Sequence, residues 1–133
     1  MPLIEWSNAL SVGFDEIDKD HEKLVGIINN FNEAIEQKKD KDDLEEHLDD
    51  LIEYTSWHFR HEERLMQGVA YPKMEQHQQI HRELATKAVE IQKQFGDGDD
   101  SVLDVLIPFL KDWLTNHILV TDKELGTYLA AQE

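Results

Sequence analysis

Apolar residues recur at alternating steps of three and four along four segments of this chain, and that spacing predicts amphipathic helices. No segment shows the strict alternation of apolar and polar residues that a half-buried strand requires. Glycine and proline are scarce, and a purely charged run at residues 38–43 breaks the pattern. We therefore expect helices over residues 18–37, 41–66, 72–95 and 101–121, followed by a C-terminal segment.

The short connections between these segments predict how the helices are arranged. Helices joined by short loops lie antiparallel to their neighbours, so the expected fold is all-α, an antiparallel up-down-up-down four-helix bundle. Residues 1–17 contain Trp6 and Phe14 without periodicity and are expected to form an N-terminal arm packed on the bundle. The length suits one domain, residues 1–133, and we expect no attached signalling domain.

Three local signals refine the ends and shape of the helices. Pro72 suits the first turn of the third helix. Ser101 with Asp104 resembles a capping box at the start of the fourth. Pro108 lies inside the fourth helix and is expected to kink it.

Composition excludes several functional classes. The chain has 13 Lys and Arg against 29 Asp and Glu, and its net charge of −16 repels nucleic-acid phosphates and anionic lipid headgroups. It has no cysteine, which removes disulfides, thiolate zinc sites and iron–sulfur clusters. The N-terminus has no basic region, and no long apolar run follows. We therefore expect a cytoplasmic protein that does not insert into a membrane. We also expect it to be a monomer.

Five of the seven histidines continue the apolar stripes, together with one glutamate. A single histidine on an apolar face is usually a hydrogen-bonded core residue. If a stripe takes about two of every seven positions, chance places this many histidines there only about 2% of the time. His47 and His61 flank the stripes and are expected to be solvated surface residues. The stripe residues are His21, His58, Glu62, His77, His81 and His117.

These six residues also share one depth in the expected bundle. They lie near the starts of the first and third helices and near the ends of the second and fourth, which meet at one end of an up-down bundle. At about 1.5 Å rise per residue, they fall within about two helical turns along the bundle axis. Buried imidazoles and a carboxylate that converge without basic partners call for a cation.

The ligand types narrow the choice of metal. Imidazole suits zinc, iron, copper or nickel, and carboxylates can bridge two ions. Five imidazoles exceed what one ion normally takes from a protein, so two metal ions fit better. The diiron oxidases of ferritin-like bundles use Glu-x-x-His pairs, and this chain contains none.

Four separately spaced motifs run through the chain. They are SVGF at residues 11–14 with IDKDH at 17–21, HFRHEE at 58–63, YP at 71–72 with His77 and His81, and WL at 113–114 with His117, Ile118 and Asp122. Any one alone would be a weak signal, but the combination is specific. The chain resembles the hemerythrins in their bacterial single-domain form, over nearly its whole length.

The resemblance implies a non-haem diiron centre that binds dioxygen reversibly. It implies two iron ions joined by an oxo or hydroxo bridge, of which one is coordinatively full and the other keeps a vacant position for oxygen. The implied ligands are His77, His81 and His117 for the full iron, His21 and His58 for the open iron, and Glu62 and Asp122 as bridges.

Periodicity alone does not find Asp122, which lies five residues after His117. That separation is about 140° around an ideal helix of 3.6 residues per turn. Without the resemblance, Asp122 would be interpreted as an exposed residue. With it, we expect the fourth helix to be irregular between these two residues, through a π-bulge, a tightened turn or a helix end.

Apolar residues one, three or four positions from the implied ligands are expected to line an oxygen pocket. Ordinary core packing is the alternative, and the two roles are compatible, because a dry pocket would also slow oxidation of the iron ions. The residues concerned are Leu24, Phe59, Trp113, Leu114 and Ile118.

The expected function is oxygen storage or delivery rather than enzymatic catalysis, with dioxygen as the ligand and an oxygen-consuming enzyme as a possible partner. Two alternatives stay open. The same domain could sense oxygen, redox state or nitric oxide. Alternatively, the chain could be a diiron oxidase or peroxidase, against which the missing Glu-x-x-His pairs argue.

Overall fold

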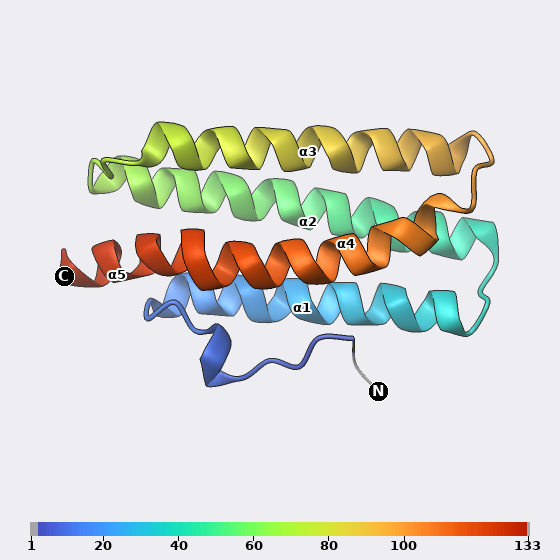
Figure 1. The fold of residues 1–133 in the computed structure, drawn as a ribbon, viewed down its shortest axis with the longest axis horizontal. Helices are drawn as coiled ribbons and strands as arrows, with labels where there is room; N and C mark the ends of the chain where they lie inside the picture. The colour runs from blue at the N-terminus through green and yellow to red at the C-terminus, as the bar shows by residue number, and fades with distance from the viewer. Residues whose placement is uncertain (1–2, 133) are drawn as a thin grey trace.

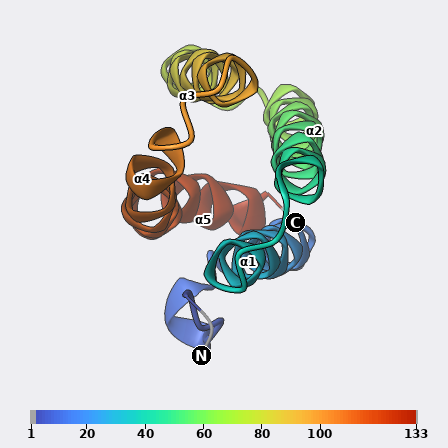
Figure 2. The ribbon, with the colours of Figure 1, turned by 90° about the vertical axis from the view of Figure 1, so that its right-hand side faces the viewer.

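Four long antiparallel helices build the protein, as a computed structural model describing residues 3–132 shows (Figure 1). Viewed along the bundle, the helices surround a common axis (Figure 2), and the described residues contain no strand. Met1, Pro2 and Glu133 lie outside the described residues. The elements are η1 Asn8–Leu10, α1 Asp15–Glu36, α2 Lys41–Gly68, α3 Met74–Gly96, α4 Val102–Asn116, η2 His117–Asp122 and α5 Lys123–Ala131. The predicted all-α bundle is confirmed.

Helix α1 begins three residues earlier than the apolar period indicated. Its first turn carries Asp15, Glu16 and Asp18, and negative charge is favourable at the positive end of a helix dipole. Asp18 also accepts hydrogen bonds from the Ser11 hydroxyl at 2.6 Å and from the Val12 N–H at 2.8 Å. The acidic first turn therefore starts the helix and ties the preceding arm to it.

Two of the predicted helix-end signals are wrong. Pro72 lies in the turn before α3, because the chain first reverses through Ala70, whose φ is 50°. Ser101 precedes α4 in a helical backbone conformation, so its hydroxyl makes no cap and instead contacts Asp99 at 2.5 Å. Pro108 does lie inside α4, and the kink stays a prediction.

The arm is held on the bundle by polar and apolar contacts. Ile4 is buried, and its N–H and carbonyl both bond to the Asn29 side chain, at 2.9 and 2.8 Å. Trp6 and Phe14 pack against the core, as predicted. Val12 lies so close to α5 that a Cβ on Gly126 would meet its carbonyl oxygen at 2.2 Å. The arm thus bridges α1 and α5.

One end of the bundle gathers the start of α1, the turn between α2 and α3, and α5, at the left of Figure 1. The buried polar side chains of the molecule collect near this end, whereas the rest of the core is apolar. Within the described part of the chain, no helix is long and apolar enough to cross a membrane.

Candidate metal centre

Seven buried side chains from α1, α2, α3 and η2 converge near that end of the bundle, and none is more than 5% exposed. Their donor atoms form two groups, and within each group all lie within 4.8 Å of one another. The two groups share Glu62 and Asp122. One group adds His21 and His58, and the other adds His77, His81 and His117. The structure therefore brings together all seven residues that the sequence singled out.

The two carboxylates each face both groups. Glu62 Oε1 lies 3.1 Å from His81 Nε2, and Glu62 Oε2 lies 3.6 Å from His58 Nε2. Asp122 divides its oxygens in the same way: Oδ1 lies 2.8 Å from His117 Nε2, and Oδ2 lies 2.9 Å from His21 Nε2. A carboxylate that presents one oxygen to each of two imidazole groups has the arrangement required of a bridging ligand.

Most of these buried donor atoms have no hydrogen-bond partner. The Nε2 atoms of His21, His77 and His81 and the four carboxylate oxygens are all unsatisfied. Burying so many unpaired polar atoms is costly, and native proteins rarely do so. Their close approach without hydrogen-bond geometry fits a set of metal ligands, so the residues present suit a cation.

The charges of the metal-free centre are set by the mutual contacts of these groups. Burial lowers the pKa of His77, but its contacts with Asp122 and Glu62 outweigh burial and raise it to about 9. Burial and the Asp122 charge raise the pKa of Glu62, yet the neighbouring imidazoles bring it down to about 2. Without a metal, the raised pKa of His77 favours its protonated form at neutral pH, and metal binding would release that proton.

Asp122 reaches the centre because the chain forms a π-helix there. The π-helical segment η2 runs from His117 to Asp122, and both of these residues are buried. An i→i+5 turn places residues five apart one above the other, whereas a regular α-helix would separate them. The predicted irregularity is confirmed, in its π-helical form.

A second carboxylate supports one of the candidate ligands. Asp20 is buried, and its Oδ2 lies 3.0 Å from His58 Nδ1 and 2.5 Å from His61 Nδ1. Burial opposes ionisation, but the bonds with these two imidazoles hold the pKa of Asp20 below its usual value. A carboxylate on the far nitrogen of a metal-binding histidine fixes its ring and raises its basicity.

The apolar period does not single out Asp20, although its position directly before His21 places it in the same layer. The prediction for His61 is also wrong, because its side chain is only 19% exposed. The acceptor that withdraws His61 from solvent comes from another helix, so periodicity on α2 could not reveal it. His47 is half-buried as well, since its ring stacks on Phe31.

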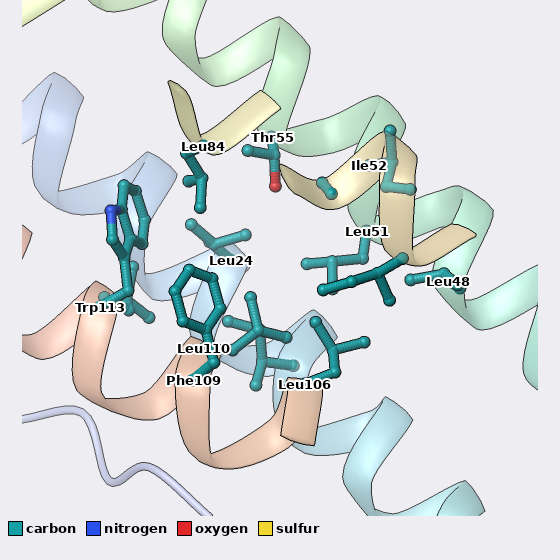
Figure 3. Close-up of a pocket in the computed structure, with 14 residues that line it drawn as sticks. Leu24, Leu48, Leu51, Ile52, Thr55, Leu84, Leu106, Phe109, Leu110 and Trp113 are labelled. Atoms are coloured by element: carbon teal, nitrogen blue, oxygen red, sulfur yellow. The ribbon is translucent and has the colours of Figure 1, made fainter. Parts of the chain in front are cut away.

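The five residues predicted to line a pocket take three kinds of position, and Trp113 takes two of them. Phe59 and Trp113 stack on candidate ligands: the Phe59 ring lies 3.8 Å from that of His81, and the Trp113 ring 4.6 Å from that of His117. Trp113 also lines an apolar cavity in the adjoining core (Figure 3), as do Leu24 and Leu114. Ile118 is 1% exposed and does not line that cavity.

Comparison with known proteins agrees with this geometry. Residues 12–129 match the family model of the hemerythrin HHE cation binding domain. A bacteriohemerythrin of Stenotrophomonas maltophilia is 31% identical over 98% of this chain and 84% of its own length. One from Pseudomonas aeruginosa is 34% identical over 89% of this chain and 76% of its own length.

Solved structures show the same fold. A crystal structure of wild-type hemerythrin superposes with a TM-score of 0.89 at 29% identity, covering 96% of this chain and 98% of that one. A hemerythrin mutant superposes with a TM-score of 0.91 at 28% identity, over 98% of this chain and 99% of that one. The family model, the relatives and the solved structures all match this chain over most of its length. The chain therefore belongs to the hemerythrin family.

Proposed function

We propose that this protein binds dioxygen reversibly at a non-haem diiron centre and serves in oxygen storage or delivery. The observation that carries the proposal is the division of both Glu62 and Asp122 between two groups of imidazoles. Two ferrous ions held there would supply one electron each to dioxygen and would recover both electrons when it leaves.

The imidazoles are divided unequally between the two groups. Three of them, His77, His81 and His117, would hold one iron, and only His21 and His58 would hold the other. With both carboxylates shared, the second ion would have one protein ligand fewer. This unequal division supports a single open position, on the side of α1 and α2.

The composition of the ligand set favours carrying oxygen over activating it. Five neutral imidazoles against two carboxylates give a less anionic site than carboxylate-rich diiron oxidases have. A less anionic site stabilises the ferrous state, which is the state that takes up oxygen. The protein is therefore proposed not to be an enzyme.

Neighbouring side chains would keep water from the bound gas. Phe59 and Trp113 cover the faces of His81 and His117, and Leu24, Leu114 and Ile118 are buried beside the layer. Excluding water slows protonation of bound oxygen and hence irreversible oxidation. We further propose that residues 1–133 form one domain and that the protein is a cytoplasmic monomer. The oxygen it carries would pass to an oxygen-consuming enzyme.

The test is an anaerobic-to-air visible spectrum of iron-loaded protein, followed by flushing with argon. We expect a charge-transfer band that appears in air and disappears under argon. His58→Ala should lose metal and band together, whereas His47→Ala, which alters a histidine outside both groups, should keep them. A band in the unmodified protein that never reverses would mean that oxygen is consumed, and the oxidase alternative would replace this proposal.

A further inference from the structure

A pocket of about 160 Å³ lies at the start of α3, on the outer side of the candidate metal centre. Its polar lining comes from Lys73, directly before α3, from Gln76 and His77 in the first residues of that helix, and from Thr121 and Glu124 on η2 and α5. A water molecule needs about 10–15 Å³ of such space, so the pocket has room for a small organic molecule.

His77 connects this pocket with the metal centre. Its Nε2 faces the centre, 3.0 Å from Asp122 Oδ1. The other part of its ring lines the pocket, and the Nδ1 atom there is buried without a hydrogen-bond partner, in a residue that is 2% exposed. Because a metal ion on Nε2 leaves the ring proton on Nδ1, this atom would be a hydrogen-bond donor in need of an acceptor.

The N-terminus of α3 favours a negative charge at the same place. The helix is 23 residues long, and in the described part of the chain no side chain caps its first turn. Unpaired N–H groups and the positive end of the dipole attract anions there. Glu75, also in the first turn, is exposed and does not line the pocket.

The charges beside the pocket select a singly charged anion. Lys73 lines the pocket, but its ammonium group is already paired with the Glu124 carboxylate. The excess positive charge is therefore small, and a chain with a net charge of −16 repels multiply charged anions most strongly. The remaining walls, the Tyr71 ring and the half-buried Ile80, offer contact to a short hydrocarbon chain.

We infer that this pocket binds a small monocarboxylate, which accepts a hydrogen bond from His77 Nδ1. The bound acid would take at His77 the place that the Asp20 carboxylate takes at His58, where Asp20 Oδ2 lies 3.0 Å from Nδ1. A carboxylate in this position raises the basicity of a metal-binding imidazole. Resting on the proposed function, we expect the bound acid to favour the oxidised, oxygenated state and thus to raise oxygen affinity.

Crystals soaked in sodium propionate under argon test the site directly, in both iron-loaded ferrous protein and metal-free protein. We expect density for propionate in both, with the carboxylate at His77 Nδ1 and the hydrocarbon end against Ile80. The metal-free crystals separate this site from any carboxylate held by iron. No propionate in the pocket, or propionate at the open iron position only, would overturn the inference.

Calorimetric titration with propionate tests which groups select it. Lys73→Met removes a charged donor and should weaken binding about 10-fold or more. Glu124→Gln removes the competing carboxylate and should tighten it. Lys111→Met, at an exposed lysine on α4 outside the pocket, should leave the affinity unchanged. Propionamide has the same shape without the charge and should bind more weakly than propionate. Equal affinities for propionate and propionamide, or for the Lys73 and Lys111 variants, would refute an anion site.

Oxygen titrations of the iron-loaded protein test the action through His77. Saturating propionate should raise oxygen affinity about 5-fold, and oxygenation should tighten propionate binding by the same factor, because coupling between two sites is reciprocal. The Lys73→Met variant should lose this effect at the same propionate concentration. An oxygen affinity that propionate does not change would refute the action through His77. If propionate binds in the pocket but the protein never oxygenates reversibly, the carboxylate site stands and the proposed function fails.

Discussion

Single residues decide how the centre is held, and Asp20 shows this most clearly. Among the candidate ligands, His58 has a carboxylate within 3.0 Å of its Nδ1, whereas the Nδ1 atoms of His21, His77 and His81 are buried without a hydrogen-bond partner. A side chain from outside the ligand layer therefore hydrogen-bonds to His58, on the side proposed for the open iron, whereas Glu63 reaches His81 Nδ1 only at 3.8 Å.

Replacing Asp20 should weaken metal binding without removing a ligand. Asp20→Asn leaves His58 in place but removes the charged acceptor at its Nδ1, and such changes typically cost about 10–100-fold in metal affinity. Chelator competition measures the loss. Asp15→Asn, at an exposed carboxylate paired with Lys19, is the control and should bind metal normally. Equal affinities for the two variants would show that Asp20 does not support His58.

Ile118 is expected to protect the oxygenated state. Ile118→Thr keeps the β-branched shape but places a hydroxyl at a position that is 1% exposed beside His117. Admitting water should shorten the lifetime of the oxygenated protein while metal content stays unchanged. The decay of the charge-transfer band in air measures this lifetime. Val120→Thr, at a 68% exposed position two residues later, should leave the lifetime unaltered. Similar lifetimes in both variants would contradict a protective role.

At the scale of the elements, the sequence predicts features that are set within a single helix and misses those that depend on contacts between helices. The 3.6-residue period predicted the four long helices, and the histidines on their stripes predicted the ligand layer, because both are properties of one helix face. The contact between Asp20 and His61 was not predicted, because the two residues lie on different helices. Asp122 conflicts with the regular period, and the resemblance to a family was needed to predict the π-helix.

Gly126 offers a test of how α5 and the arm are joined. Gly126→Ala would place a Cβ 2.2 Å from the Val12 carbonyl oxygen, so the arm must shift. Overpacking of this kind costs about 1–3 kcal/mol, which should appear as a lower free energy of unfolding. The control is Gly26→Ala, at an exposed site in α1 with no atom within 4 Å. It should stabilise the protein by up to about 1 kcal/mol. Equal effects would mean that the close approach is not rigid.

At the scale of the whole molecule, stability and metal binding are coupled through protons. In the metal-free protein the pKa of His77 is raised to about 9 by Asp122 and Glu62 despite burial, and contacts with Glu62 and Asp20 raise that of His58. A raised pKa in the folded state stabilises the protein below the unfolded pKa, near 6.5 for histidine, and this stabilisation is lost as pH rises through the folded pKa.

The free energy of unfolding of the metal-free protein should therefore fall between pH 6.5 and 9. In the metal-loaded protein the imidazoles bind metal in place of protons, so the same fall should be absent. Urea unfolding at several pH values, with and without metal, gives both curves. Parallel curves for the two forms would show that the protons and the metal do not compete for these residues.

Two metal ions joined by Glu62 and Asp122 are the core of the proposed function. Anomalous scattering at the iron edge, from crystals of iron-loaded protein, measures them directly. We predict two iron peaks per chain, about 3.5–4 Å apart as in other two-metal sites. One should lie among His77, His81 and His117, the other between His21 and His58, with both carboxylates shared. A single peak, or two peaks that Asp122 does not join, would contradict the proposed diiron centre.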